Sequence, residues 1–147
     1  MIVTLIGFFY GGGSRKSAFN ETWMNKNFLK QHQEAFGAES QPSKEGYPDT
    51  GNGIYSKQLS YKQWYEFNLN QRCHMNCMET VLQQMLFMLV AGVHYPKVSY
   101  ILGGIACAGR VFYAYGYARD PKLRMPGFIL TMGSMMSSFF VSLASIY

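Results

Sequence analysis

The sequence predicts an all-α membrane protein: a transmembrane four-helix bundle with a short first helix and a long polar loop between the first and second helices. Two observations support this prediction. Charged residues are unevenly distributed along the chain. Residues 1–66 carry seven Lys/Arg and six Asp/Glu, whereas residues 67–147 carry six Lys/Arg and two Asp/Glu. In the second part the charges lie mostly at the ends of long apolar runs, a composition typical of membrane-spanning helices. We therefore divide the chain into an apolar segment (1–13), a polar water-side segment (14–66) and a membrane domain with three spans (67–147).

The N-terminal segment, residues 1–13, is apolar but marginal as a membrane span. As a helix, about 13 residues extend only roughly 20 Å. No basic residue precedes the run, and no clear small-residue cleavage site follows it, which argues against a cleaved signal peptide.

The polar segment is expected to lie on the water side of the membrane. Residues 14–36 are predicted to form one surface helix. Pro42, Pro48 and the glycine-rich run 46–53 favour turns, so a long ordered loop should follow this helix.

Three long apolar stretches then predict the membrane domain. The first of these three spans is expected over 67–93 and the second over 98–118, with a tight turn at residues 94–97 between them. A short basic loop follows, and Pro126 opens the last helix, over 127–147. Arg119, Lys122 and Arg124 lie in this loop, whereas Lys97 is the only basic residue of the opposite turn. The positive-inside rule therefore predicts that the basic face is cytosolic, or lies on the equivalent side of an organelle membrane.

Polar side chains recur at helical spacing inside two of these apolar helices. Spacings of 4, 3 and 4 place the members of the first stripe on one side of a helix; they are Arg72, Asn76, Glu79 and Gln83. The next helix repeats the pattern at spacings of 3 and 4, with Arg110, Tyr113 and Tyr117. Isolated polar groups are costly in lipid, so both stripes should face other helices, a neighbouring subunit or a ligand.

Helical rise also predicts which charges of the two stripes meet. Glu79 and Arg110 each lie about 10 Å deeper than the polar residue nearest the basic face on the same helix. We expect them within salt-bridge or single-water distance, in one subunit or across two.

Two interpretations of this polar cluster stay open on chemical grounds. It is a structural core, held by an ion pair of Arg110 with Glu79, or it is a site for a small zwitterion or polyanion. In a binding site, arginines hold carboxylates, Glu79 holds an ammonium and tyrosine hydroxyls fix the orientation of the ligand. Arg124 would complete such a site, and a guanidinium beside a thiol stabilises the reactive thiolate.

Other classes of site find little support. The net charge of +5 comes without a continuous basic stripe or an aromatic nucleic-acid motif, so we predict no nucleic-acid partner. Cys73, Cys77 and Cys107 are too few and wrongly spaced for a disulfide framework or a zinc site, so we interpret them as packing residues. The histidines do not indicate a metal site.

Two blocks carry a resemblance to a known family. The run FNLNQRCHMNCME at 67–79 resembles the Phe-Asn-x-x-Gln-Arg-x-His-x-Asn-x-x-Glu signature of the membrane-associated proteins in eicosanoid and glutathione metabolism (MAPEG). The run GRVFYAYGYAR at 109–119 resembles the second block of that family and is most similar to the type three microsomal glutathione S-transferases. The spacing onward to Leu123 and Arg124 is similar to that of leukotriene-C synthase. The resemblance covers roughly residues 64–147.

This resemblance implies a homotrimer in the endoplasmic reticulum or a mitochondrial membrane, with glutathione bound between neighbouring subunits. The implied glutathione-binding residues are Arg72, Asn76, Glu79, Tyr113 and Tyr117. Arg124 would be the catalytic residue that holds the sulfur as thiolate, and Arg110 would have a supporting structural role. The implied activity is that of a glutathione transferase or glutathione-dependent peroxidase acting on hydrophobic electrophiles or lipid hydroperoxides.

Three departures from the family pattern keep an alternative open. Thr80 stands where some members have a glutathione-contacting tyrosine, the first helix is short, and the following connection is long. A large added surface usually contacts something. The alternative is therefore a non-catalytic structural subunit of a larger membrane assembly, such as a respiratory complex. The native mass of the assembly distinguishes the two hypotheses. The enzyme is expected to be a homotrimer, whereas the structural subunit would be present as a single copy bound to other proteins.

Overall fold

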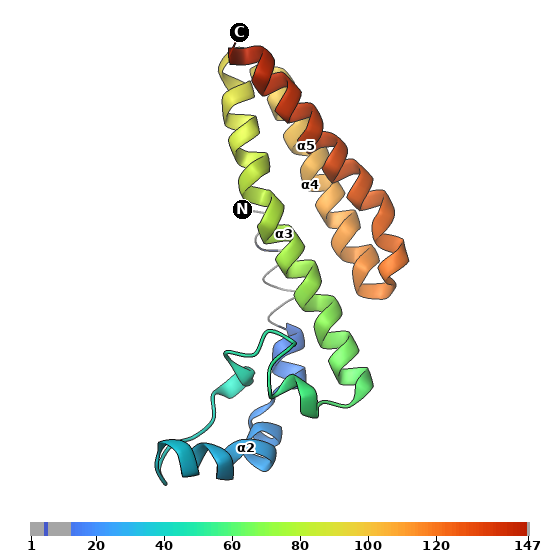
Figure 1. The fold of residues 1–147 in the computed structure, drawn as a ribbon. Helices are drawn as coiled ribbons and strands as arrows, with labels where there is room; N and C mark the ends of the chain where they lie inside the picture. Colours follow the sequence, from blue (N-terminus) through green and yellow to red (C-terminus); the bar gives the residue numbers. More distant parts are fainter. Residues whose placement is uncertain (1–4, 6–12, 147) are drawn as a thin grey trace. The chain divides into compact units, whose positions relative to one another are not determined.

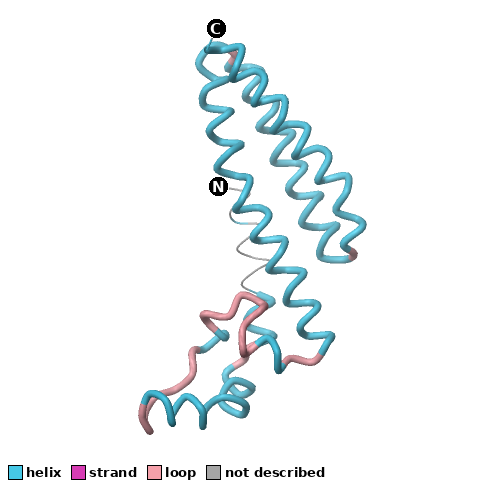
Figure 2. The backbone as a smooth tube through the Cα atoms, viewed as in Figure 1, coloured by secondary structure: helices cyan, strands magenta, loops and turns pink. Residues whose placement is uncertain are grey.

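The computed structural model describes Leu5 and residues 13–146, and within this part of the chain the secondary structure is helical (Figures 1 and 2). The chain forms two compact units, which we call the N-terminal unit (Tyr10–Gln71) and the C-terminal unit (which includes Arg72–Tyr147). The apolar segment predicted over 1–13 lies almost wholly outside the described residues.

The N-terminal unit contains helical residues 13–18, α2 (Glu21–Phe36) and two short 3₁₀ turns, η1 (Lys44–Gly46) and η2 (Ser56–Gln58). The prediction of one helix over 14–36 was wrong, because Asn20 interrupts it. Asn20 has an extended backbone, and its side-chain oxygen accepts a hydrogen bond from Trp23 N at 2.8 Å. It thereby caps a new helix that begins at Glu21.

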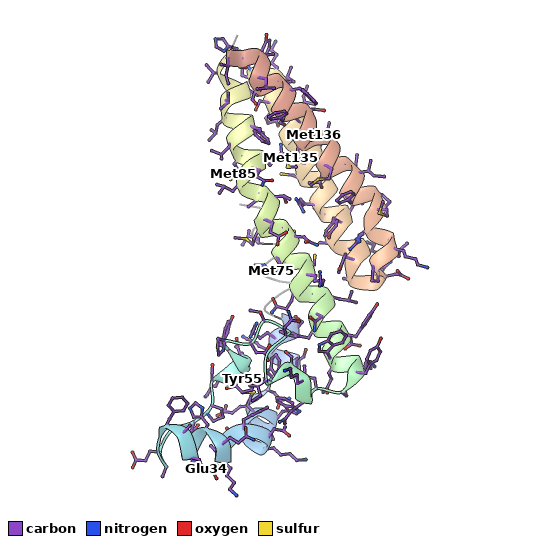
Figure 3. The ribbon with its side chains drawn as sticks, in the orientation of Figure 1. Glu34, Tyr55, Met75, Met85, Met135 and Met136 are labelled. Carbon is purple, nitrogen blue, oxygen red and sulfur yellow. The ribbon has the colours of Figure 1, made fainter. Side chains whose placement is uncertain are left out.

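Aromatic side chains form the core of this unit. Phe19 and Phe67 are fully buried and meet edge to face, with ring centroids 4.9 Å apart. Phe28 meets Tyr55 in the same way at 4.6 Å, and Figure 3 shows Tyr55 among the side chains that fill the unit. Such ring pairs stabilise a small core beyond the area that they bury.

Two buried charged side chains order the loop around this core. Arg15 donates to the backbone oxygens of Glu45 (3.1 Å) and Asp49 (2.7 Å). The Asp49 carboxylate accepts bonds from the backbone N–H groups of Gly51 (2.7 Å), Gly53 (3.0 Å) and Ser56 (2.7 Å), and from the Ser56 hydroxyl (2.7 Å). The long polar segment is therefore held by charge-assisted hydrogen bonds.

The long helices are α3 (Tyr61–His94), α4 (Pro96–Arg119) and α5 (Met125–Ile146), with η3 (Pro121–Arg124) between the last two. α3 begins before the predicted residue 67 because Ser60 and Gln63 form a capping box. Gln63 N donates to Ser60 Oγ at 3.4 Å, and Ser60 N donates to Gln63 Oε1 at 3.2 Å. α4 begins at Pro96, where proline is tolerated.

α4 and α5 lie side by side along most of their length (Figure 1). Small residues permit this approach: a Cβ added at Gly109 would lie 2.7 Å from Thr131 Oγ1. The α5 face turned inward is a stripe of small residues, namely Gly127, Thr131, Ser134, Ser138 and Ser142. Ser134 Oγ donates to Leu102 O at 2.6 Å, so hydroxyl groups at the interface find partners between helices.

Two helical segments in the described part of the chain are long and apolar enough to cross a membrane, Tyr61–His94 and Pro121–Ile146. They correspond to the first and third predicted spans. α4 is long enough but less apolar than these two segments, because Arg110 and the many tyrosines and glycines of this helix lower its hydropathy. A third span and a complete four-helix bundle stay predictions.

Replacing Asp49 by asparagine should destabilise the N-terminal unit. Burial raises the pKa of Asp49, but the hydrogen bonds from Ser56, Gly51 and Gly53 outweigh burial and hold this pKa below its ordinary value. The carboxylate therefore stabilises the unit fully above pH about 4, and this contribution is lost as the pH falls through the folded-state pKa. We expect Asp49→Asn to lower the free energy of unfolding by about 1–3 kcal/mol at pH 7, and the difference should shrink below pH about 4.

Tryptophan fluorescence measures this transition in the full chain, because both tryptophans, Trp23 and Trp64, lie in the N-terminal unit. The exposed Glu39→Gln variant is the matched control. An equal difference between wild type and Asp49→Asn at pH 7 and pH 3 would contradict the assignment.

Candidate functional site

A pocket of about 430 Å³ lies within the C-terminal unit, between α3, α4 and the beginning of α5. Its lining residues are Arg72, Asn76, Glu79, Thr80, Arg110, Tyr113, Arg124, Met125, Phe128 and Met132. All the residues predicted for the site except Tyr117 are therefore among the residues that line one pocket. Its volume lies in the range of small-molecule sites, about 300–1,000 Å³.

Hydrogen bonds between α3 and α4 fix the inner wall of this pocket. Asn76 Nδ2 donates to the hydroxyl of Tyr113 at 2.7 Å. Arg110 is only 5% exposed; its guanidinium donates to the backbone oxygen of Asn76 at 3.3 Å and to the hydroxyl of Thr80. Because three hydrogen bonds join α3 and α4 here, the two helices have one preferred register.

The predicted direct ion pair between Arg110 and Glu79 does not form within the described chain. Arg110 bonds to Thr80, the residue that follows Glu79, while the Glu79 side chain lines the same pocket and is exposed. The α3 residues that face α4 follow a spacing of four, so the threonine meets the guanidinium instead of the glutamate. A contact across subunits or through one water stays a prediction.

The residue that follows the predicted one is also the buried residue at the C-terminal end of the predicted stripe on α3. Gln83 is exposed and does not line the pocket, whereas its neighbour Gln84 is buried. Gln84 Nε2 donates to Ser138 Oγ at 3.0 Å, which ties α3 to α5.

Two tyrosines of α4 stack beside the pocket, and one of them, Tyr113, lines it. The rings of Tyr113 and Tyr117 lie 5.5 Å apart and nearly parallel, and each side chain is 4% exposed. The guanidinium of Arg124 lies 5.3 Å from the centre of the Tyr117 ring. Tyr117 does not line the pocket itself. Its ring forms a cation–π contact with Arg124, and Arg124 lines the pocket.

The turn before α5 determines where Arg124 lies. Asp120 caps η3, since its side chain accepts a bond from Lys122 N at 2.7 Å. Gly116 packs directly against the following backbone: an added Cβ would lie 2.7 Å from the carbonyl carbon of Leu123 and 3.2 Å from Arg124 N. A glycine at 116 thus permits the close approach that brings Arg124 to the pocket.

Charge in the pocket is predominantly positive. Arg72, Arg110 and Arg124 face it together with one carboxylate, that of Glu79. The described residues form no ion pair among these four groups. Such a set can bind a small molecule that has several anionic groups and one ammonium.

Comparison with known families assigns the chain to one family. The model of the MAPEG family matches residues 24–144. The chain belongs to the MAPEG family. The match includes α3, α4 and nearly all of α5, and it begins within α2, so much of the N-terminal unit is part of it. Family membership and the two apolar segments support a membrane protein with a function in glutathione or eicosanoid metabolism.

Sequence reasoning missed several residues of this MAPEG pocket. Met125, Phe128 and Met132 form an apolar wall on α5. Their spacings of 3 and 4 indicate one helical face, but many apolar residues of this helix share that pattern. Thr80 departs from the family pattern, yet its hydroxyl accepts a hydrogen bond from Arg110.

Removing the Thr80 hydroxyl should destabilise the C-terminal unit. Thr80→Val leaves a donor of the buried Arg110 guanidinium without its partner, which costs about 1–3 kcal/mol. We expect the melting temperature to fall by about 5 °C or more, whereas Thr80→Ser, which retains a hydroxyl, should behave like the wild type. The measurement is a thermal melt with a thiol-reactive fluorophore, because Cys73 and Cys77 are buried in this unit and react on unfolding. Equal melting temperatures for the valine and serine variants would contradict the role of the hydroxyl.

Proposed function

We propose that this MAPEG protein is a membrane-bound glutathione transferase or glutathione-dependent peroxidase that acts on hydrophobic electrophiles or lipid hydroperoxides. The observation that carries the proposal is the pocket in which three guanidinium groups and one carboxylate converge from α3, η3 and α4. Glutathione has two carboxylates, one ammonium and one thiol, so its charges complement those of the pocket.

Each pocket residue has a role in this proposal. Arg72 binds a carboxylate of glutathione, and Glu79 binds its ammonium. Asn76 and Tyr113, which are already hydrogen-bonded to each other at 2.7 Å, present polar atoms that orient the peptide. Arg110 keeps α3 and α4 in register, which is a positioning role.

Arg124 is the proposed catalytic residue. Its guanidinium, held against the Tyr117 ring, favours the thiolate of glutathione over the thiol. The thiolate sulfur attacks an electrophilic carbon of the second substrate and forms the thioether, while the bond from that carbon to its leaving group breaks and the group departs with the electron pair. When the carbon belongs to an activated double bond, the π bond breaks instead and the electron pair takes up a proton. With a lipid hydroperoxide the thiolate attacks the terminal oxygen, the O–O bond breaks, and the lipid leaves as its alcohol after protonation. A second glutathione then converts the sulfenic acid to glutathione disulfide and water.

The apolar wall supports a hydrophobic second substrate. Met125, Phe128 and Met132 line the pocket from α5, and the polar groups of α3 line the same pocket. A thiolate between a polar wall and an apolar wall suits a reaction between a water-soluble peptide and a lipid. We further propose a homotrimer in the endoplasmic reticulum or a mitochondrial membrane, with an activity similar to that of the type three microsomal enzymes, on the resemblance of residues 109–119.

One observation favours the non-catalytic alternative. The N-terminal unit has its own aromatic core and an ordered loop around Asp49, so it presents a folded surface that another chain of a membrane assembly can bind. The intact set of charged residues in the pocket favours the enzyme.

Thiolate formation tests the proposed function. Adding glutathione to the detergent-solubilised protein near pH 7 should produce the ultraviolet absorbance of a thiolate, because a nearby guanidinium lowers a thiol pKa by about 1 to 3. Arg124→Leu should abolish this absorbance and lower the turnover about 100-fold. Arg119→Leu is the matched control, since Arg119 belongs to the same basic segment but contacts Tyr115 and does not line the pocket.

Two results would contradict the enzymatic proposal. One is a wild-type protein that yields no thiolate absorbance at millimolar glutathione. The other is an Arg124→Leu variant that retains the absorbance and activity of the wild type.

A further inference from the structure

The basic turn that joins α4 to α5 carries two cations outside the charged pocket (Figure 1). Arg119 is the last residue of α4, and Lys122 lies in η3, three residues later. Both side chains are exposed. In the turn at the other end of α4, Lys97 is the one Lys/Arg. Positive charge on the surface of the C-terminal unit is therefore concentrated at this turn.

No acidic side chain of the described residues forms an ion pair with these two cations. The undescribed residues cannot supply one, because all eight Asp/Glu of the chain belong to the described part. The carboxylate nearest in sequence is that of Asp120, and it accepts a hydrogen bond from Lys122 N at 2.7 Å as the cap of η3. An exposed pair of cations without a fixed counter-charge attracts an anion from outside the chain.

A contact with an aromatic ring orients the Arg119 guanidinium. Its Cζ lies 4.0 Å from the centre of the Tyr115 ring, one helical turn earlier in α4. Side chains of a helix lean toward its N-terminus, so the guanidinium extends from the end of α4 back along the helix. Tyr115 is 52% exposed, and tyrosine is frequent at the level of lipid headgroups. This arrangement favours an anion that lies at the surface of a membrane.

An exposed apolar face of α4 continues from this guanidinium. Phe112 and Ile105, which are 56% and 39% exposed, precede Arg119 by 7 and 14 residues and so lie on the same side of the helix. Fourteen residues of helix extend about 21 Å, more than the hydrocarbon depth of one leaflet, about 15 Å. A lipid chain can therefore lie along this face while its headgroup contacts Arg119.

We propose that Arg119 and Lys122 bind the headgroup of an anionic phospholipid, whose acyl chain lies along the face of α4 that Tyr115, Phe112 and Ile105 form. Guanidinium and ammonium groups are both partners of phosphate in proteins. A soluble phosphate would meet the same two cations but would leave the apolar face without a contact. The combination of unpaired positive charge and exposed apolar surface assigns the site to a lipid.

This proposal goes beyond the glutathione function and does not depend on it. Arg119 and Lys122 do not line the charged pocket. In detergent without anionic lipid, variants at these two positions should keep the thiolate absorbance that glutathione produces. A failure of one proposal is therefore distinguishable from a failure of the other.

Competition between two lipids tests the proposal in the full chain. The detergent-solubilised protein is mixed with equal amounts of palmitoyl-oleoyl phosphatidylglycerol and palmitoyl-oleoyl phosphatidylcholine, and native mass spectrometry gives the fraction bound to each. The acyl chains are the same, so the ratio reports the headgroup. Each Lys/Arg near an anionic headgroup strengthens binding about fivefold, so the wild type should prefer phosphatidylglycerol about 20-fold. Added salt should reduce this preference.

Variants assign the preference to the two cations. Arg119→Gln and Lys122→Gln should each lower it to about fivefold, and the double variant should bind the two lipids almost equally. Lys97→Gln is the matched control, because it removes the same charge from the other end of α4, and it should retain the preference of the wild type. A thermal melt of each variant shows whether the protein is folded.

Three results would overturn the proposal. The first is a wild type that does not distinguish the two lipids. The second is a preference that Lys97→Gln lowers as much as Arg119→Gln does, since net charge alone would then explain it. The third is displacement of phosphatidylglycerol by an excess of glycerophosphoglycerol, which has the headgroup without acyl chains, because the site would then recognise a soluble phosphate ester.

Discussion

The burial of one guanidinium constrains the whole C-terminal unit. Arg110 is in the middle of α4, and a charged group in an apolar environment is tolerated only when its hydrogen bonds are satisfied. The backbone oxygen of Asn76 and the hydroxyl of Thr80 supply those bonds from α3. A slip of α3 by one residue would remove them, so the guanidinium fixes the register of the two helices. The same register brings Asn76 to Tyr113 and places the polar side chains of both helices around one pocket.

Close packing of α5 then gives this pocket its second wall and its proposed catalytic residue. Small residues let α5 approach α4, which brings the apolar side chains Met125, Phe128 and Met132 into the pocket that the polar residues also line. The compact turn at η3, permitted by Gly116, carries Arg124 to the same space. Polar groups fixed by Arg110 and apolar groups fixed by the small-residue face of α5 thus lie within one cavity. This combination relates the fold of a MAPEG protein to the reaction that we propose for it, between glutathione and a lipid.

Periodicity in the sequence predicts much of this arrangement but not its details. Spacings of three and four identify Arg72, Asn76 and Glu79 as one helical face, and all three line the pocket. Which side chains of α3 and α4 meet depends on how the two helices cross. The residue spacing within one helix does not contain that information. Thr80 therefore meets Arg110 where Glu79 was expected, and Gln84 is buried where Gln83 was expected. The break at Asn20 and the capping box of Ser60 and Gln63 are local signals that the sequence does contain. The longer hydrophobic and polar runs around them predict helix boundaries that differ from those of the structure.

The claim that this pocket binds glutathione is tested most directly by a calorimetric double-mutant cycle. Glutathione and N-acetylglutathione, which lacks the ammonium, are titrated into the wild type and into Glu79→Gln. If Glu79 holds the ammonium, each single change should weaken binding about tenfold, and the two together should weaken it little further. Losses that simply multiply, or a wild type that does not distinguish the two peptides, would contradict the account.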